Sequence, residues 1–149
     1  MERSDFPIPN HGFVTTHFVV AEDLERTAHF YSYVLGGEVI FAAEGAPTVV
    51  KLANTWVIIN IGGGPTPDKP TVTLEPPADP DRVNAFMNIR VADIAAIHAE
   101  WSQRGAEFLT EPHDNNGIEL RCYLKDPDGR LIEVGQATGM LEMIGVANE

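Results

Sequence analysis

The chain has 149 residues, of which 44% are hydrophobic and 21% are charged. These are the values of a globular domain and not of a disordered or fibrous chain. Its 22 acidic and 10 basic residues give a formal net charge of −12, which repels phosphate backbones and anionic lipids, so we expect neither nucleic acid nor a membrane as partner.

The first half of the sequence predicts a strand, a helix and three further strands. Runs rich in valine, isoleucine and aromatic residues predict strands near residues 13–21, 38–43, 48–53 and 56–62. After the first run, Asp23 is a candidate helix N-cap, and apolar residues then recur at helical spacing from Leu24 to Leu35. Gly36 fits the left-handed conformation that ends a helix.

The middle of the sequence is rich in proline and glycine. Six of the 11 prolines fall within residues 63–82, which excludes a helix or a central strand there and indicates a semi-rigid linker. A connection of this length is either a spacer or part of a functional site. We expect a linker that also borders the mouth of a pocket.

The second half repeats the pattern of the first. Strands are expected near residues 84–91, 106–110, 118–125 and 130–136. Asp93 is again a candidate N-cap, apolar residues at helical spacing follow up to Trp101, and Gly105 fits the end of the helix. The sequence Asp-Pro-Asp-Gly at 126–129 has the signature of a type I turn and predicts a hairpin. The chain is therefore a duplicated βαβββ unit of the α+β class.

Two motifs carry a resemblance to a known family. The first is the sequence THFVVAEDLER at residues 16–26, and the second is DPDGRLIEV at residues 126–134. With the duplication, they make the chain resemble the vicinal oxygen chelate (VOC) superfamily of glyoxalases, bleomycin-resistance proteins and extradiol dioxygenases over residues 12–136.

The resemblance implies a single VOC domain over residues 1–149. Two tandem βαβββ modules, at about 12–62 and 83–136, would form a curved mixed sheet, a cup around a small-molecule pocket. The linker at 63–82 joins the modules, and a tail follows at 137–149.

The resemblance also implies metal-ligand positions on the first and last strand of each module. His17 and Glu133 fill two of them, and matching the last strands of the two modules puts Asn60 at the position equivalent to Glu133. His113, in the loop at 111–117, is a further candidate ligand. A catalytic divalent ion, here zinc, nickel, manganese or iron, usually needs about three protein ligands, so this set is incomplete.

The fifth strand lacks the histidine that many relatives carry. Matching the two helix caps, Asp23 and Asp93, places Met87 opposite His17, whereas the usual family spacing favours Phe86. An extradiol dioxygenase needs two histidines and one carboxylate on one face, so this activity is the least favoured.

Alternation along the strands predicts which side chains face the pocket. With Glu133 facing inward, the expected substrate-binding residues are Trp56, Asn60, Phe86, Asn88, Arg90, Arg121 and Tyr123. The residues expected to pack behind them are Val57, Ile59, Ile61, Cys122, Leu124, Ile132 and Val134. Aromatic walls with a few polar groups are typical of small-molecule sites. The two arginines either clamp a carboxylate or enolate oxygen, or pair with Glu133 and surface acids.

Two functions follow from this face. In a lyase or isomerase, a metal ion or an arginine would polarise a carbonyl, with Glu133 as the catalytic residue, either a metal ligand or the base. In a binding or resistance protein, the same face would hold an aromatic drug or metabolite without catalysis. Fold alone does not choose between them.

The location and assembly of the chain are also expectations. Cys122 is the single cysteine, which fits a reducing compartment. Residues 1–7 lack the apolar run of a signal peptide, so we expect a cytoplasmic protein. The apolar segment at 140–144 either caps the core or joins a homodimer interface.

Overall fold

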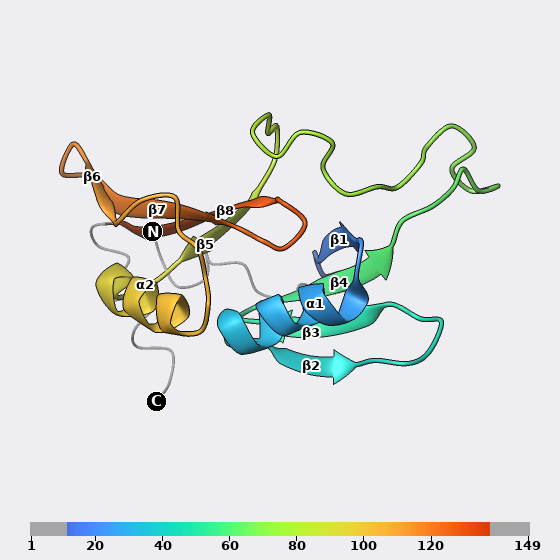
Figure 1. Ribbon diagram of the computed structural model, residues 1–149, viewed down its shortest axis with the longest axis horizontal. Coiled ribbons are helices and arrows are strands. Elements are labelled where there is room, and N and C mark those ends of the chain that lie inside the picture. The colour runs from blue at the N-terminus through green and yellow to red at the C-terminus, as the bar shows by residue number, and fades with distance from the viewer. Residues whose placement is uncertain (1–11, 138–149) are drawn as a thin grey trace. The chain divides into compact units, whose positions relative to one another are not determined.

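A computed structural model of the chain describes residues 12–137, which divide into two compact units. The first unit holds the described residues up to Asp79 together with Pro127–Gly129, and the second holds the remainder. Each unit contains a four-stranded mixed sheet and a helical segment, as the predicted α+β fold with two βαβββ modules requires (Figure 1). No helix in residues 12–137 is both long enough and apolar enough to cross a membrane.

The first unit arranges its strands in the order β1-β4-β3-β2. Their bounds are β1 (His17–Ala21), β2 (Glu38–Phe41), β3 (Thr48–Leu52) and β4 (Thr55–Ile61). β1 runs parallel to β4, and the other pairs are antiparallel. Val57 and Ile59 are fully buried on the predicted core face, whereas Ile61, which we expected behind them, lies at the strand end and is exposed.

The helical segment of the first unit begins where the sequence predicts. α1 (Leu24–His29) starts at Asp23, whose side chain accepts a hydrogen bond from the backbone N–H of Arg26 at 3.0 Å. It continues as a π-helical turn, η2 (Phe30–Val34), and Gly36 has the expected positive φ of 83°. The buried face keeps the i, i+3, i+4, i+7 and i+8 spacing of an ordinary α-helix across this turn. Its members are Thr27, Phe30, Tyr31, Val34 and Leu35.

The second unit repeats this arrangement in the order β5-β8-β7-β6. Its elements are β5 (Met87–Arg90), α2 (Ile94–Gln103), β6 (His113–Asn115), β7 (Glu119–Lys125) and β8 (Leu131–Ala137). The side chain of Asp93 caps α2 by accepting from the N–H of Ala96 at 3.0 Å. Gln136 accepts from the N–H of Ile94 at 2.8 Å, which ties the helix to β8.

One predicted strand of the second half is wrong. Residues 106–110 form no strand in the structure, and only Phe108 makes an isolated bridge, to Leu124. The pairing strand is β6, which contains His113 and lies where the sequence predicted a loop. Asn116 and Gly117 both have positive φ, 56° and 71°, which suits the tight turn that returns β6 into β7.

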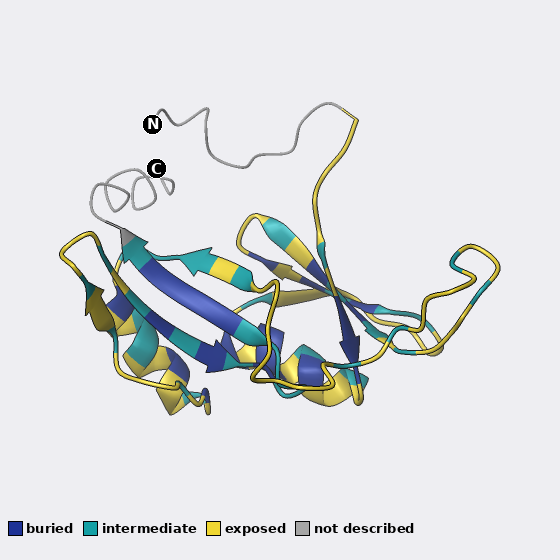
Figure 2. Ribbon diagram, turned by 90° about the horizontal axis from the view of Figure 1, so that it is seen from above, coloured by how far each residue is buried: buried dark blue, intermediate teal, exposed yellow. Residues whose placement is uncertain are grey.

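The linker is exposed along most of its length, as its composition predicts (Figure 2). It is nevertheless tied to its own start, because Gly63 and Leu74 exchange backbone hydrogen bonds of 2.8 and 2.9 Å. A Cβ atom on the adjacent Gly62 would lie 2.2 Å from the carbonyl oxygen of Leu74. Glycine is therefore required at position 62 for this close approach.

Candidate functional site

The second sheet has one polar face and one apolar face. Asn88 and Tyr123 both pair with Glu133, from β5 and β7 respectively, so these three side chains share one face. The other face carries the buried residues Cys122, Leu124, Ile132 and Val134. This division confirms the strand alternation that the sequence predicted for β7 and β8.

Glu133 is the centre of the polar face. It is 5% exposed, and both of its carboxylate oxygens accept hydrogen bonds. Oε1 accepts from Asn88 Nδ2 at 2.8 Å and from Arg90 Nη2 at 3.3 Å. Oε2 accepts from the hydroxyl of Tyr123 at 2.6 Å. This hydrogen bond, followed by burial, raises the pKa of Tyr123, because it favours the protonated phenol.

Arg90 reaches Glu133 through space that a glycine leaves open. Arg90 pairs with Gly135 across the two strands, and a Cβ atom at position 135 would lie 2.1 Å from Arg90 Nη1. Any side chain at that position would therefore displace the guanidinium. Arg121 pairs with Gly135 from the other side, so both arginines flank the same open position.

Glu119 is a member of this face that the predicted site residues do not include. Its Oε2 accepts from Arg90 Nη1 at 2.7 Å, and its Oε1 accepts from Arg121 Nη1 at 3.2 Å. The hydrogen bond from Arg90 is the main cause that holds the pKa of Glu119 below its ordinary value. Glu119 lies two residues before Arg121 on the same strand, so strand alternation already carried the signal. Of the two expected roles of the arginines, pairing with carboxylates is the one observed.

Aromatic and exposed groups border the network. The ring of Phe86, which is 45% exposed, meets the ring of Tyr123 edge-on, with centroids 6.2 Å apart and planes at 74°. Asn88 is exposed, and His113 pairs with Arg121 across β6 and β7, so its exposed side chain lies on the same face. The second unit thus brings together most of the residues predicted to bind a ligand.

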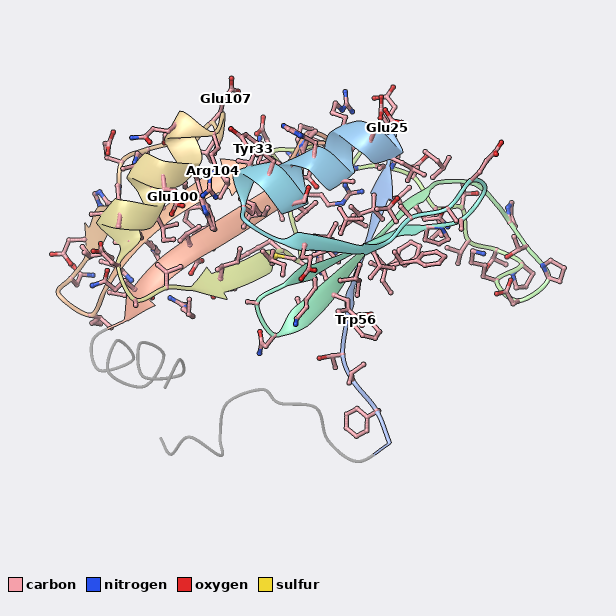
Figure 3. All side chains as sticks on the ribbon, turned by 90° about the horizontal axis from the view of Figure 1, so that it is seen from below. Glu25, Tyr33, Trp56, Glu100, Arg104 and Glu107 are labelled. Atoms are coloured by element: carbon pink, nitrogen blue, oxygen red, sulfur yellow. The ribbon has the colours of Figure 1, made fainter. Side chains whose placement is uncertain are left out.

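The first unit holds the other predicted site residues. Trp56 is exposed and projects away from α1 (Figure 3). Asn60 Oδ1 accepts a hydrogen bond from the backbone N–H of Ile61 at 2.9 Å. The register pairs His17 with Val57 and Val20 with Asn60, so His17 and Asn60 lie on opposite faces of their sheet. His17 shares the face of the buried core, and its role as a metal ligand stays a prediction.

The groups around Glu133 suit a carboxylate that accepts hydrogen bonds from the protein better than one that binds a metal ion. Among residues 12–137, no three histidine, cysteine, aspartate or glutamate side chains come together as ligands of one ion would. Glu133 already accepts three hydrogen bonds, and the guanidinium of Arg90 lies 3.3 Å from Oε1. A divalent cation there would be repelled by that charge, so this donor set does not fit one.

The fold has many solved counterparts. One is a glyoxalase/bleomycin resistance protein/dioxygenase from Alicyclobacillus acidocaldarius, with 15% identity, a TM-score of 0.67, and coverage of 92% of this chain and 99% of that chain. A second is TnmS3, an antibiotic binding protein from Streptomyces sp. CB03234, with 18% identity, a TM-score of 0.60, and coverage of 87% and 100%. A third is an integron cassette protein from V. cholerae, with 17% identity, a TM-score of 0.63, and coverage of 87% and 98%.

No curated protein matches the chain. The family model of the Glyoxalase/Bleomycin resistance protein/Dioxygenase superfamily matches residues 13–134, which include the first βαβββ module, the DPDG turn and the second module up to the middle of β8. The duplicated fold, the paired helix caps and this match together establish that the chain belongs to the Glyoxalase/Bleomycin resistance protein/Dioxygenase superfamily.

Proposed function

We propose that the chain binds a small aromatic drug or metabolite on the polar face of the second sheet, without a metal ion. The observation that carries the proposal is the pair of Phe86 and Tyr123, an exposed ring set edge-on to a ring whose hydroxyl is fixed by the buried Glu133. Aromatic surface beside a few immobilised polar groups is what small organic ligands use for affinity and for orientation.

The similarity to TnmS3 supports the binding function. TnmS3 is described as an antibiotic binding protein, and its fold covers 87% of this chain. Sequence identity of 18% carries only the fold, so the argument for this chain depends on its own residues. Arg90 and Arg121 are paired with carboxylates and Glu133 is hydrogen-bonded three times, which gives a rigid polar face for recognition.

Fluorescence titration with N-phenyl-1-naphthylamine, an uncharged probe with a naphthyl and a phenyl group, tests the proposal. We expect Phe86→Ala to weaken its binding roughly tenfold, the effect of one lost ring contact with its buried area. Tyr33→Ala is the matched control, because Tyr33 is an exposed aromatic residue of the other unit, whose ring stacks only on His29 in the described contacts (Figure 3). A chelator should leave the affinity unchanged.

Two results would contradict the proposal. The first is probe affinity that is equal in the wild type, Phe86→Ala and Tyr33→Ala, since the probe would then bind elsewhere. The second is loss of probe binding on addition of the chelator, since the expected zinc, nickel, manganese or iron ion would then be part of the site.

A proton-transfer enzyme is the second candidate, and the 2.6 Å hydrogen bond between Tyr123 and Glu133 favours it. In that reaction Glu133 would take a proton next to a substrate carbonyl, while Tyr123 or a neighbouring arginine stabilised the enolate oxygen. A panel of oxo-aldehydes separates the candidates. If the wild type turns over one of these substrates and Glu133→Gln abolishes the turnover, the chain is an enzyme. If the chain binds the neutral probe but turns over none of the substrates, the binding function is the one supported.

Assembly and location stay predictions from the sequence. The segment at 140–144, which suggested a homodimer, lies outside the described residues. Sedimentation velocity of the purified chain measures its mass directly, and a monomer at micromolar concentration would contradict the expected dimer.

A further inference from the structure

We infer that Glu119 makes the polar face select uncharged ligands over anionic ones, and that it is the specificity-determining residue of the binding site. The inference rests on the proposed binding function and names its ligand class. A small molecule whose polar groups are neutral donors and acceptors fits this face, whereas a carboxylate, sulfonate or phosphate does not.

The charges of this face cancel one another. Its cations are Arg90, Arg121 and Lys125, since the register places Lys125 opposite Leu131 on the side of Glu133. Arg90 pairs with Glu119 and Glu133, and Arg121 pairs with Glu119. Lys125 pairs with Asp81, with Nζ and Oδ1 2.5 Å apart. Among these ion pairs, three positive charges meet three negative ones.

Glu119 is central to this balance of charges because its carboxylate pairs with both Arg90 and Arg121. Its side chain is 15% exposed, whereas that of Arg121 is 38% exposed, so Arg121 is the cation that a ligand meets first. An anion approaching Arg121 must either compete with the carboxylate of Glu119 or lie beside it. Both arrangements are unfavourable, because two like charges then share one guanidinium.

A neutral ligand meets no such obstacle. The N–H groups of Arg121 that do not face Glu119 remain donors, and the exposed Asn88 offers an amide with both a donor and an acceptor. The net charge of −12 acts in the same direction, because it lowers the local concentration of anions.

A pair of fluorescent probes that share one ring system tests the inference. The neutral probe is N-phenyl-1-naphthylamine, and the anionic probe is 8-anilinonaphthalene-1-sulfonate, which differs by a single sulfonate. The readout is the ratio of the two dissociation constants, anionic over neutral. We expect a ratio above one for the wild type. Glu119→Gln should lower it roughly tenfold, the effect of removing one charge about 6 Å away at an intermediate dielectric.

Two further variants separate local charge from total charge. Glu100→Gln is the matched control, because it removes the same charge and also frees an arginine, Arg104, but on α2 (Figure 3). It should leave the ratio unchanged. The double variant Glu119→Gln with Arg121→Gln restores the balance of charges, so its ratio should return toward the wild-type value.

A ratio that Glu119→Gln leaves unchanged, or that Glu100→Gln lowers equally, would overturn the inference. If Glu119→Gln lacks the far-ultraviolet circular dichroism of the folded protein, Arg121→Gln alone decides, since it leaves the face with one excess negative charge and should raise the ratio. These results are distinct from failure of the binding function itself. The binding function fails if Phe86→Ala does not change the affinity for the neutral probe. In that case the probes bind elsewhere, and the ratio of their dissociation constants does not report on this face.

Discussion

Asp128 should contribute more to stability than any exposed acidic residue, and replacing it is a direct test of the contacts in the first unit. Its side chain is 1% exposed, and Thr27 beside it is fully buried. Asp128 Oδ2 accepts from the hydroxyl of Thr27 at 2.6 Å, and Oδ1 accepts from the backbone N–H of Glu22 at 2.9 Å. Arg26 adds a longer contact of 3.4 Å.

Asp128→Ala should lower the free energy of unfolding by about 3 kcal/mol. A hydrogen bond to a charged group contributes about 1.5–3 kcal/mol, and the hydroxyl of Thr27 loses its acceptor where water does not reach it. The side chain of Arg26 is 47% exposed, so its ion pair is screened by solvent and adds little. Urea unfolding followed by circular dichroism measures the change, which corresponds to a shift of roughly 6–12 °C in Tm.

Two companion variants test the physical reason. Thr27→Val removes the buried donor, so adding it to Asp128→Ala should cost less than it costs alone, because no hydroxyl is then left without a partner. Asp114→Ala is the control, because Asp114 is exposed. The one side-chain hydrogen bond described for it is accepted from the backbone N–H of Gly117, which is also exposed. The reasoning is refuted if Asp128→Ala costs less than about 1 kcal/mol or no more than Asp114→Ala.

Two other predictions concern the second unit. Burial raises the pKa of Cys122 to about 11, so this thiol stays protonated at pH 8. A disulfide reagent should therefore label Cys122 only after urea is added. Rapid labelling of the native protein would contradict this prediction. The pKa of Glu119 is lowered by the hydrogen bond from Arg90, so its stabilising effect is present at neutral pH and is lost as the pH falls through that lowered pKa. Between pH 6 and pH 3, the Tm of the wild type should therefore fall more steeply than that of Glu119→Gln, and parallel curves would disprove the assignment.

Local features of the fold could be predicted from the sequence. Asp23 and Asp93 cap their helices as expected, because a cap depends only on the first turn that follows it. The alternation of β7 and β8 was also predictable, since the period of a strand fixes which side chains share a face. Glu133 and Tyr123 were therefore placed together from the sequence alone.

The features that the sequence did not reveal depend on pairing between distant segments. The π-helical turn after His29 forms without any local signal such as proline or glycine within it. The strand at His113 was missed although Asn116 and Gly117 carry the signal of a tight turn. Glu119 shares a face with Arg121 by alternation along β7, but Arg90 reaches it only when β5, β8 and β7 pair.

The face of His17 shows how much depends on a shift of one residue. Matching the two caps placed Met87 opposite His17, and the structure pairs Met87 with Ile132 and His17 with Val57, both of which belong to the buried core. The internal duplication therefore predicted the shared orientation of these two residues. The spacing usual in the family predicted a different one.

The position of Asp128 limits how the gene of this protein can be rearranged. Residues 127–129 belong to the first compact unit although they follow the linker by more than forty positions. A stop codon within the linker would leave the hydroxyl of Thr27 in the truncated product without its acceptor. A chimera that takes its first module from a relative must also take the matching turn, so the two repeats are not interchangeable parts.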